Sequence, residues 1–101
     1  MTRKIFKYEI PIADDFSLPL PQGARVLSID VQNGTPFIWA LVDEEAGKES
    51  VYFHLAGTGH VVPPHVADSY AFVGTFMLHG GALVFHLFRK RGVVEAILGV
   101  L

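Results

Sequence analysis

The chain of 101 residues contains no cysteine. A disulfide framework and a thiolate metal site are therefore excluded, and a reducing compartment is expected. Charge is scarce as well, because only 18% of the residues are charged and the net charge is −2 at pH 7. Half of the residues are hydrophobic, which excludes a disordered composition. A chain of this length builds one core, so we expect residues 1–101 to form a single domain.

Long apolar runs are also missing. The longest nearly uncharged stretch, residues 69–88, contains two histidines and a Gly80-Gly81 pair, which indicates two strands and a turn rather than a membrane span. The N-terminus has basic residues but no apolar run, so we expect no signal peptide, no membrane contact and a cytoplasmic location. A domain this small cannot bury all of its apolar side chains, and the surplus predicts self-association into a homo-oligomer.

Two patterns begin the chain. Residues 4–12 alternate between apolar and polar side chains, which predicts a half-buried strand in residues 1–12 that Pro11 ends or confines to a sheet edge. Residues 13–24 carry paired aspartates, two prolines and a glycine around alternating apolar residues. We predict an extended arm packed on the domain, ending in a turn.

The clearest local signal is Asn33-Gly34, which is typical of a two-residue hairpin turn. It predicts a hairpin of residues 25–33 with residues 35–43. Its register places four pairs opposite one another: Leu27 and Ala40, Ser28 and Trp39, Ile29 and Ile38, Asp30 and Phe37. The predicted core face is wholly apolar and consists of Leu27, Ile29, Val31, Ile38, Ala40 and Val42. The other face mixes aromatic and polar side chains, which suits an interface, and we expect that interface to contain Phe37, Trp39, Leu41 and Tyr52.

The rest of the chain also favours strands. A charged turn at residues 43–48 leads into a third strand, so we expect residues 25–56 to be a three-stranded meander. Residues 57–70 predict a loop with one helical turn after Pro64. Gly80-Gly81 predicts a second hairpin over residues 71–90, with the pairs His79 and Ala82, Met77 and Val84, Thr75 and His86, and Phe76 and Phe85. Residues 91–101 form an apolar tail, either a short helix or a strand.

These elements together predict a mainly β fold. We expect a small antiparallel sandwich or a partly open barrel of about six strands, with at most one or two short helical turns.

Five histidines invite a metal-site interpretation, because imidazole is a common metal ligand. None of them shows the HxH or HExxH spacing, so we favour ordinary hydrogen-bonding roles. If a metal binds, the expected ligands are His60, His65 and His79. The segment Gly57, Thr58, Gly59 and His60 can form a nest of backbone N–H groups for an anion, although a tight turn is the simpler interpretation.

Catalytic patterns are absent from the sequence. There is no cysteine and no GxSxG motif, and the acidic pairs Asp14-Asp15 and Glu44-Glu45 have diverging side chains. We therefore expect a protein that is not an enzyme, has no catalytic residue and carries no cofactor.

Basic residues cluster near both ends of the chain: Arg3, Lys4 and Lys7, and Arg89, Lys90 and Arg91. Nucleic-acid binding becomes plausible if these two groups meet in space, with Phe37, Trp39 or Tyr52 as stacking residues. This remains a secondary hypothesis.

Four strings carry a family resemblance: KYEIPI, LPxGARVLSxxVQNGxPxIWALVD, LAGTGH and GTFxLHGGALVFHLF. They cover residues 4–88 and resemble a family of small bacteriophage and prophage proteins of unknown function. The resemblance implies a phage or prophage origin and action in the bacterial host cytoplasm, and it transfers no catalytic residue. Our leading hypothesis is a non-enzymatic protein-binding or assembly module, homo-oligomeric, with a host or phage protein as partner. The alternatives are a nucleic-acid-binding accessory protein and a histidine-based metal or small-ligand domain.

Overall fold

The computed structural model describes residues 2–92. Within them lie seven strands, one α-helix and one 3-10 turn. In chain order they are β1 (Arg3–Glu9), β2 (Asp15–Pro21), β3 (Arg25–Gln32), β4 (Thr35–Asp43), β5 (Lys48–Gly57), α1 (Pro64–Ser69), β6 (Tyr70–Leu78), the 3-10 turn (His79–Gly81) and β7 (Leu83–Lys90). None of the helices in residues 2–92 has the length and hydropathy needed to span a bilayer.

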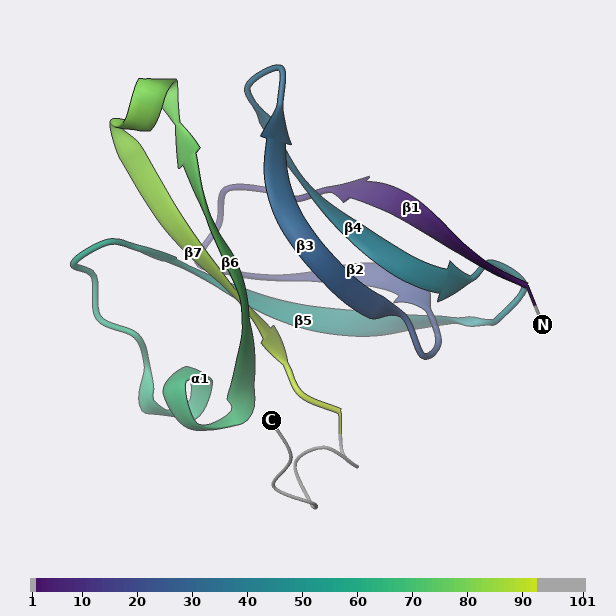
Figure 1. The fold of residues 1–101 in the computed structure, drawn as a ribbon. Coiled ribbons are helices and arrows are strands. Elements are labelled where there is room, and N and C mark those ends of the chain that lie inside the picture. The colour runs from purple at the N-terminus through teal and green to yellow at the C-terminus, as the bar shows by residue number, and fades with distance from the viewer. Residues whose placement is uncertain (1, 93–101) are drawn as a thin grey trace.

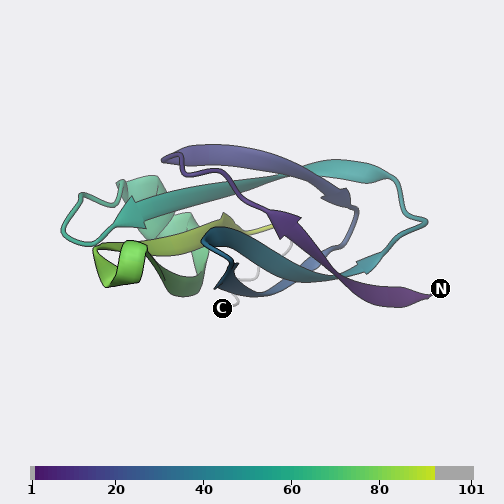
Figure 2. The same cartoon turned by 90° about the horizontal axis from the view of Figure 1, so that it is seen from above.

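The strands form two antiparallel sheets that are packed as an open sandwich. One sheet has the order β1-β4-β3, and the other has the order β2-β5-β7-β6. Figure 1 shows β3 and β4 crossing in front of β2 and β5, with α1 beside the start of β6, and Figure 2 shows the same arrangement from above. The predicted fold class is confirmed, with seven strands in place of about six and without closure into a barrel.

The core lies between the two sheets and follows the alternation of the strands. Ile38, Ala40 and Val42 of β4 face inward and are buried. Val51, Phe53 and Leu55 of β5 meet them from the other sheet. The side chains between these residues on both strands therefore lie on the outer faces of the sandwich.

The β3–β4 hairpin confirms the predicted turn. Asn33 and Gly34 have positive φ values of 51° and 78°, as a type I′ turn requires. The pairs of Ile29 with Ile38, Ser28 with Trp39, and Asp30 with Phe37 are confirmed. The prediction for Leu27 is wrong: a β-bulge between Val26 and Ser28 makes Val26 the partner of Ala40, and Leu27 is left 42% exposed.

Two longer-range predictions, for residues 13–24 and for residues 25–56, are wrong because each segment contains a strand of the four-stranded sheet. Residues 13–24 are not only an arm, since β2 pairs with β5 along its whole length. Residues 25–56 are not a meander, because β4 already has β1 and β3 as neighbours and β5 passes to the other sheet. Pro19 and Pro21 are tolerated in β2 because it is an edge strand of its sheet.

The second hairpin is confirmed together with the helical turn after Pro64. Met77 pairs with Val84, Thr75 with His86, and Phe76 with Phe85. His79 and Ala82 flank the turn, with the Ala82 N–H donating to the His79 carbonyl at 3.2 Å. In the predicted tail 91–101, residues 93–101 lie outside the described residues.

Candidate protein-binding surface

The outer face of β4 carries a row of three large apolar side chains. Phe37, Trp39 and Leu41 alternate with the buried residues of the strand and are themselves only partly buried. The rings of Phe37 and Trp39 meet edge to face, with centroids 6.3 Å apart. We call these three residues the β4 stripe. The sequence predicted their common face, and the structure confirms that they share it.

Polar side chains line the β4 stripe on both sides. The register of β4 with its two neighbours places Glu9 and Asp30 beside Phe37, and Lys7 and Ser28 beside Trp39. The Lys7 ammonium lies 4.6 Å from the centroid of the Phe37 ring, which is within the range of a cation–π interaction. It also donates to the Gln32 side-chain oxygen at 2.9 Å. The centre of this face is therefore apolar, and its margin is charged and polar.

Two exposed apolar residues lie on the strands beside β4. Ile5 pairs directly with Leu41 and is 57% exposed, so it extends the β4 stripe. Leu27 projects from the β3 bulge and lines a pocket with Ala71, Phe72 and Val73 of β6. The sequence analysis missed both as surface residues. The alternation of β1, in which Ile5 shares its face with Lys7, was the available signal for Ile5. No local signal marked the bulge that turns Leu27 outward.

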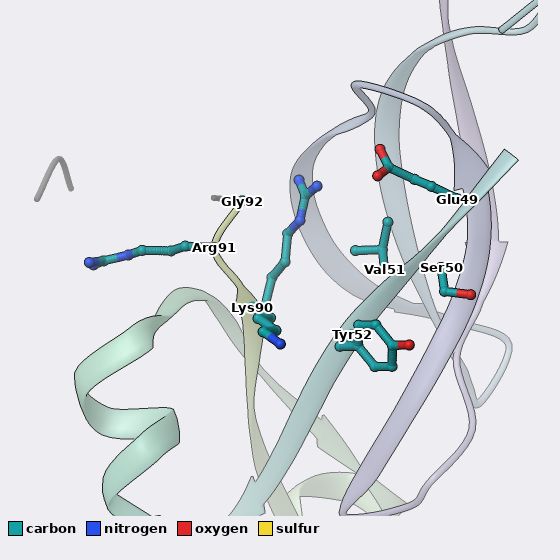
Figure 3. Close-up of a pocket in the computed structure, with 8 residues that line it drawn as sticks. Glu49, Ser50, Val51, Tyr52, Lys90, Arg91 and Gly92 are labelled. Carbon is teal, nitrogen blue, oxygen red and sulfur yellow. The ribbon is translucent and has the colours of Figure 1, made fainter. Parts of the chain in front are cut away.

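Tyr52, the fourth residue of the predicted interface, lies elsewhere. It belongs to β5 in the other sheet, where it alternates with the buried Val51 and Phe53, so the four residues predicted for the interface do not share one surface. Tyr52 lines a cleft between β5 and the end of β7 with Glu49, Ser50, Val51 and residues 89–92 (Figure 3). The strands diverge there because their pairing ends at Phe53 and Arg89.

The three consecutive cations at this cleft do not converge. Lys90 lies with its ammonium 5.5 Å from the Tyr52 ring centroid. Arg89 donates to the Ala24 carbonyl at 2.9 Å, and Arg91 points away from the β5 residues in Figure 3. Glu49 adds a negative charge to the same cleft. At the other end of the chain, Lys4 forms an ion pair with Glu44. Binding to a phosphate backbone uses several cations on one surface, whereas Lys4, Arg89 and Lys90 each face a different partner within the chain.

A second apolar surface lies on the outer face of the four-stranded sheet. Phe72 and Met77 of β6 are 59% and 58% exposed. Phe72 meets Phe88 of β7 edge to face at 5.6 Å. The helix α1 covers a neighbouring part of this face, where Val66 is fully buried and the His65 ring packs on Tyr70.

The segment Gly57–His60 forms a turn in which several polar groups bond to other parts of the chain. The Thr58 N–H donates to the Val84 carbonyl at 3.1 Å, and the His60 N–H donates to the Gly57 carbonyl at 3.0 Å. The Thr58 hydroxyl lies 2.7 Å from Nε2 of His86, whose Nδ1 lies 2.8 Å from the Thr75 hydroxyl. Two of the N–H groups expected to cradle an anion thus bond to the protein itself.

The three predicted metal ligands are not brought together. Among residues 2–92 there is no group of three or more histidine, aspartate or glutamate side chains that could hold a metal ion. His60 packs beside Gly57, His65 packs on Tyr70, and His79 lies in the β6–β7 turn.

A fourth histidine, His54, is buried and takes part in a small polar cluster. Its Nδ1 lies 2.8 Å from an Asp15 carboxylate oxygen. Burial, followed by the negative charge of Asp15, raises the pKa of the nearby Tyr70 above its ordinary value of 10.0. These groups lie on β2, β5 and the start of β6, and the His54–Asp15 contact joins β5 to β2.

Comparison with known families gives one match. The family model described as Domain of unknown function (DUF7352) matches residues 1–96, almost the whole chain. The chain belongs to this family. No curated protein and no solved structure matches it. The DUF7352 match includes every residue of the β4 stripe and every strand of both sheets.

Proposed function

We propose that the protein is a non-enzymatic protein-binding or assembly module that works as a homo-oligomer and receives its partner on the β4 stripe. The observation that carries the proposal is the position of Trp39, which lies in the middle of an apolar row with polar residues on both sides. Protein interfaces have this composition, with aromatic anchors at the centre and a polar rim.

The stripe is not needed to complete the core of the domain. Ile38, Ala40 and Val42 fill the interior from β4, whereas Phe37, Trp39 and Leu41 face away from it. A row of large apolar side chains on an outer face usually marks a partner site. Two pairs of polar side chains elsewhere on the sheets bond within the chain, Asp15 with His54 and Thr75 with His86.

The resemblance to small phage and prophage proteins supports a phage or prophage origin. It favours a partner in the bacterial cytoplasm, either a host protein or another phage protein. The surplus of exposed apolar side chains on both sheets supports the homo-oligomer.

Affinity capture from a bacterial host extract tests the partner site with two matched variants. Trp39→Ser removes the centre of the β4 stripe, and Tyr52→Ser removes a more exposed aromatic residue from the other sheet. We expect a stoichiometric partner that is captured by the wild type and by Tyr52→Ser but is lost with Trp39→Ser. Equal capture by all three proteins, or loss with Tyr52→Ser instead, would overturn the assignment of the surface.

A further inference from the structure

Among residues 2–92, four strands lie at the edges of the two sheets, and one of them, β1, has an open edge that is not interrupted by proline. β3 and β6 lie against each other, since a Cβ on Gly74 would come within 2.6 Å of Ile29. β2 carries Pro19 and Pro21, which interrupt an edge. β1 has seven residues and no proline, and among residues 2–92 it pairs with β4 alone.

The backbone groups on the free edge of β1 can be assigned from one hydrogen bond. The Ile10 N–H donates to the Pro36 carbonyl at 3.1 Å, in the same register as the β1–β4 pairs. Hydrogen-bonded positions alternate along an antiparallel strand, so the even-numbered residues bond to β4. The N–H and carbonyl groups of Arg3, Ile5, Lys7 and Glu9 therefore point to the open side.

We infer that β1 pairs with β1 of a second copy of this chain, antiparallel and centred on Phe6, so that two three-stranded sheets join into one of six strands. This pairing places Arg3 opposite Glu9 of the other copy, Lys4 opposite Tyr8, Ile5 opposite Lys7, and Phe6 opposite Phe6. Every charged residue then faces an opposite charge, an aromatic ring or an apolar side chain. The inference rests on the homo-oligomer of the proposed function but not on the partner site at the β4 stripe.

Charge selects this register over its neighbours. A two-residue shift in one direction places Arg3 opposite Lys7, and a shift in the other direction places Lys7 opposite Lys7; like charges directly opposite are destabilising. Shifts by one residue would put the core face of one copy on the outer side of the other. Charged side chains usually prevent an edge strand from pairing. In β1 they disfavour the shifted registers but not the one centred on Phe6.

The pairing would also bury apolar side chains of β1 that are exposed in the single chain. Six of its seven residues are exposed, including Ile5 at 57% and Phe6 at 36%. In the dimer the two Phe6 rings meet across a non-hydrogen-bonded pair, where side chains approach most closely. Ile5 packs on the aliphatic stem of Lys7, whose ammonium is drawn toward Phe37 and Gln32.

Cysteine cross-linking tests the register, because the chain contains no cysteine of its own. In the proposed pairing the two Cα atoms at position 6 are about 4.5 Å apart, within the range of a disulfide. We expect Phe6→Cys to form a covalent dimer rapidly under mild oxidation, whereas Ile5→Cys and Lys7→Cys do not. Preferential cross-linking of Ile5→Cys or Lys7→Cys, or none at any of the three positions, would overturn the register.

Light scattering on charge variants provides a second test that does not depend on position 6. We expect the wild type to reach twice the chain mass of 11.1 kDa. Glu9→Lys should weaken the dimer about tenfold, because two symmetry-related pairs become repulsive, and the double variant Arg3→Glu/Glu9→Lys should restore it. A wild-type monomer at all concentrations would overturn both this inference and the homo-oligomer. A dimer indifferent to these substitutions would overturn the β1 pairing alone and point to the Phe72–Met77 face.

Discussion

The Cγ2 methyl group of Ile29 on β3 lies 2.6 Å from the position that a Cβ would occupy on Gly74 of β6. This close approach joins the two sheets at one corner of the sandwich. A Cβ at position 74 would overlap this methyl group, so any other residue there requires Ile29 or the strands to shift.

Gly74→Ala should therefore lower the free energy of unfolding by about 1–3 kcal/mol, the usual cost of overpacking a well-filled contact. Urea denaturation measures the change. Gly47→Ala is the matched control, since a Cβ there meets no atom within 4 Å. Equal denaturation midpoints for the two variants would show that the corner can relax and would contradict the account.

Thr75→Val should destabilise the fold by about 1 kcal/mol, because it removes a hydrogen bond to His86 while keeping the shape of the side chain. Thr75→Ser keeps the hydroxyl and should preserve that hydrogen bond. Thr58→Val removes the hydrogen bond on the other ring nitrogen. A double-mutant cycle with Thr58→Val and Thr75→Val should show coupling through the imidazole, and strict additivity would argue against a shared network.

Asp15→Asn should lower the pKa of Tyr70, because the carboxylate adds to the effect of burial. Ultraviolet titration of tyrosinate, with Tyr8 and Tyr52 replaced by phenylalanine, isolates the Tyr70 signal. An unchanged or higher pKa would show that Asp15 does not act on this hydroxyl.

The raised pKa of Tyr70 also fixes the sign of an alkaline effect on stability. The unfolded chain loses this proton from about pH 10.0, whereas the folded chain holds it to a higher pH. Stability should therefore be intact below pH 10.0 and fall as the pH rises toward the folded value. Burial also raises the pKa of Tyr8, so the effect of Tyr70 is best measured in a Tyr8→Phe background. There, Tyr70→Phe should reduce the fall in the free energy of unfolding above pH 10.0. The same dependence on pH in Tyr8→Phe and in Tyr8→Phe/Tyr70→Phe would contradict the linkage.

Adjacent residues of β4 should separate stability from binding. Ile38 is fully buried, so Ile38→Ala should cost about 2–5 kcal/mol of folding free energy. Trp39→Ser, one residue along, should cost much less because the side chain lies on the outer face. Urea denaturation of the two variants is the comparison, and a loss of stability for Trp39→Ser as large as that for Ile38→Ala would place Trp39 in the core instead.

Local signals in the sequence predicted the hairpins well. Asn33-Gly34 and Gly80-Gly81 determine where the chain reverses, and three of the four pairs predicted for the first hairpin are confirmed. No turn residue marks the bulge beside Leu27, so local signals did not predict it. Local signals could not identify residues 13–24 as a strand either, because its partner, β5, lies about thirty residues further along the chain.

The candidate surface was likewise predictable only in the part that depends on local signals. Alternation within one strand was enough to place Phe37, Trp39 and Leu41 on a common face. It could not show that β5 leaves β4 for the second sheet, and so Tyr52 was assigned to the wrong surface. The open edge of β1 likewise depends on the order of strands in the sheet, which sequence periodicity does not contain.

The most direct test of the β4 stripe is hydroxyl-radical footprinting of the protein in bacterial host extract and in buffer. Trp39 is the single tryptophan of the chain, and Tyr52 on the other sheet is an internal reference. The account predicts that the oxidation rate of Trp39 relative to Tyr52 falls sharply in the extract, because a partner covers the stripe. The same ratio of Trp39 to Tyr52 oxidation in host extract and in buffer would contradict the proposal that this face binds a protein.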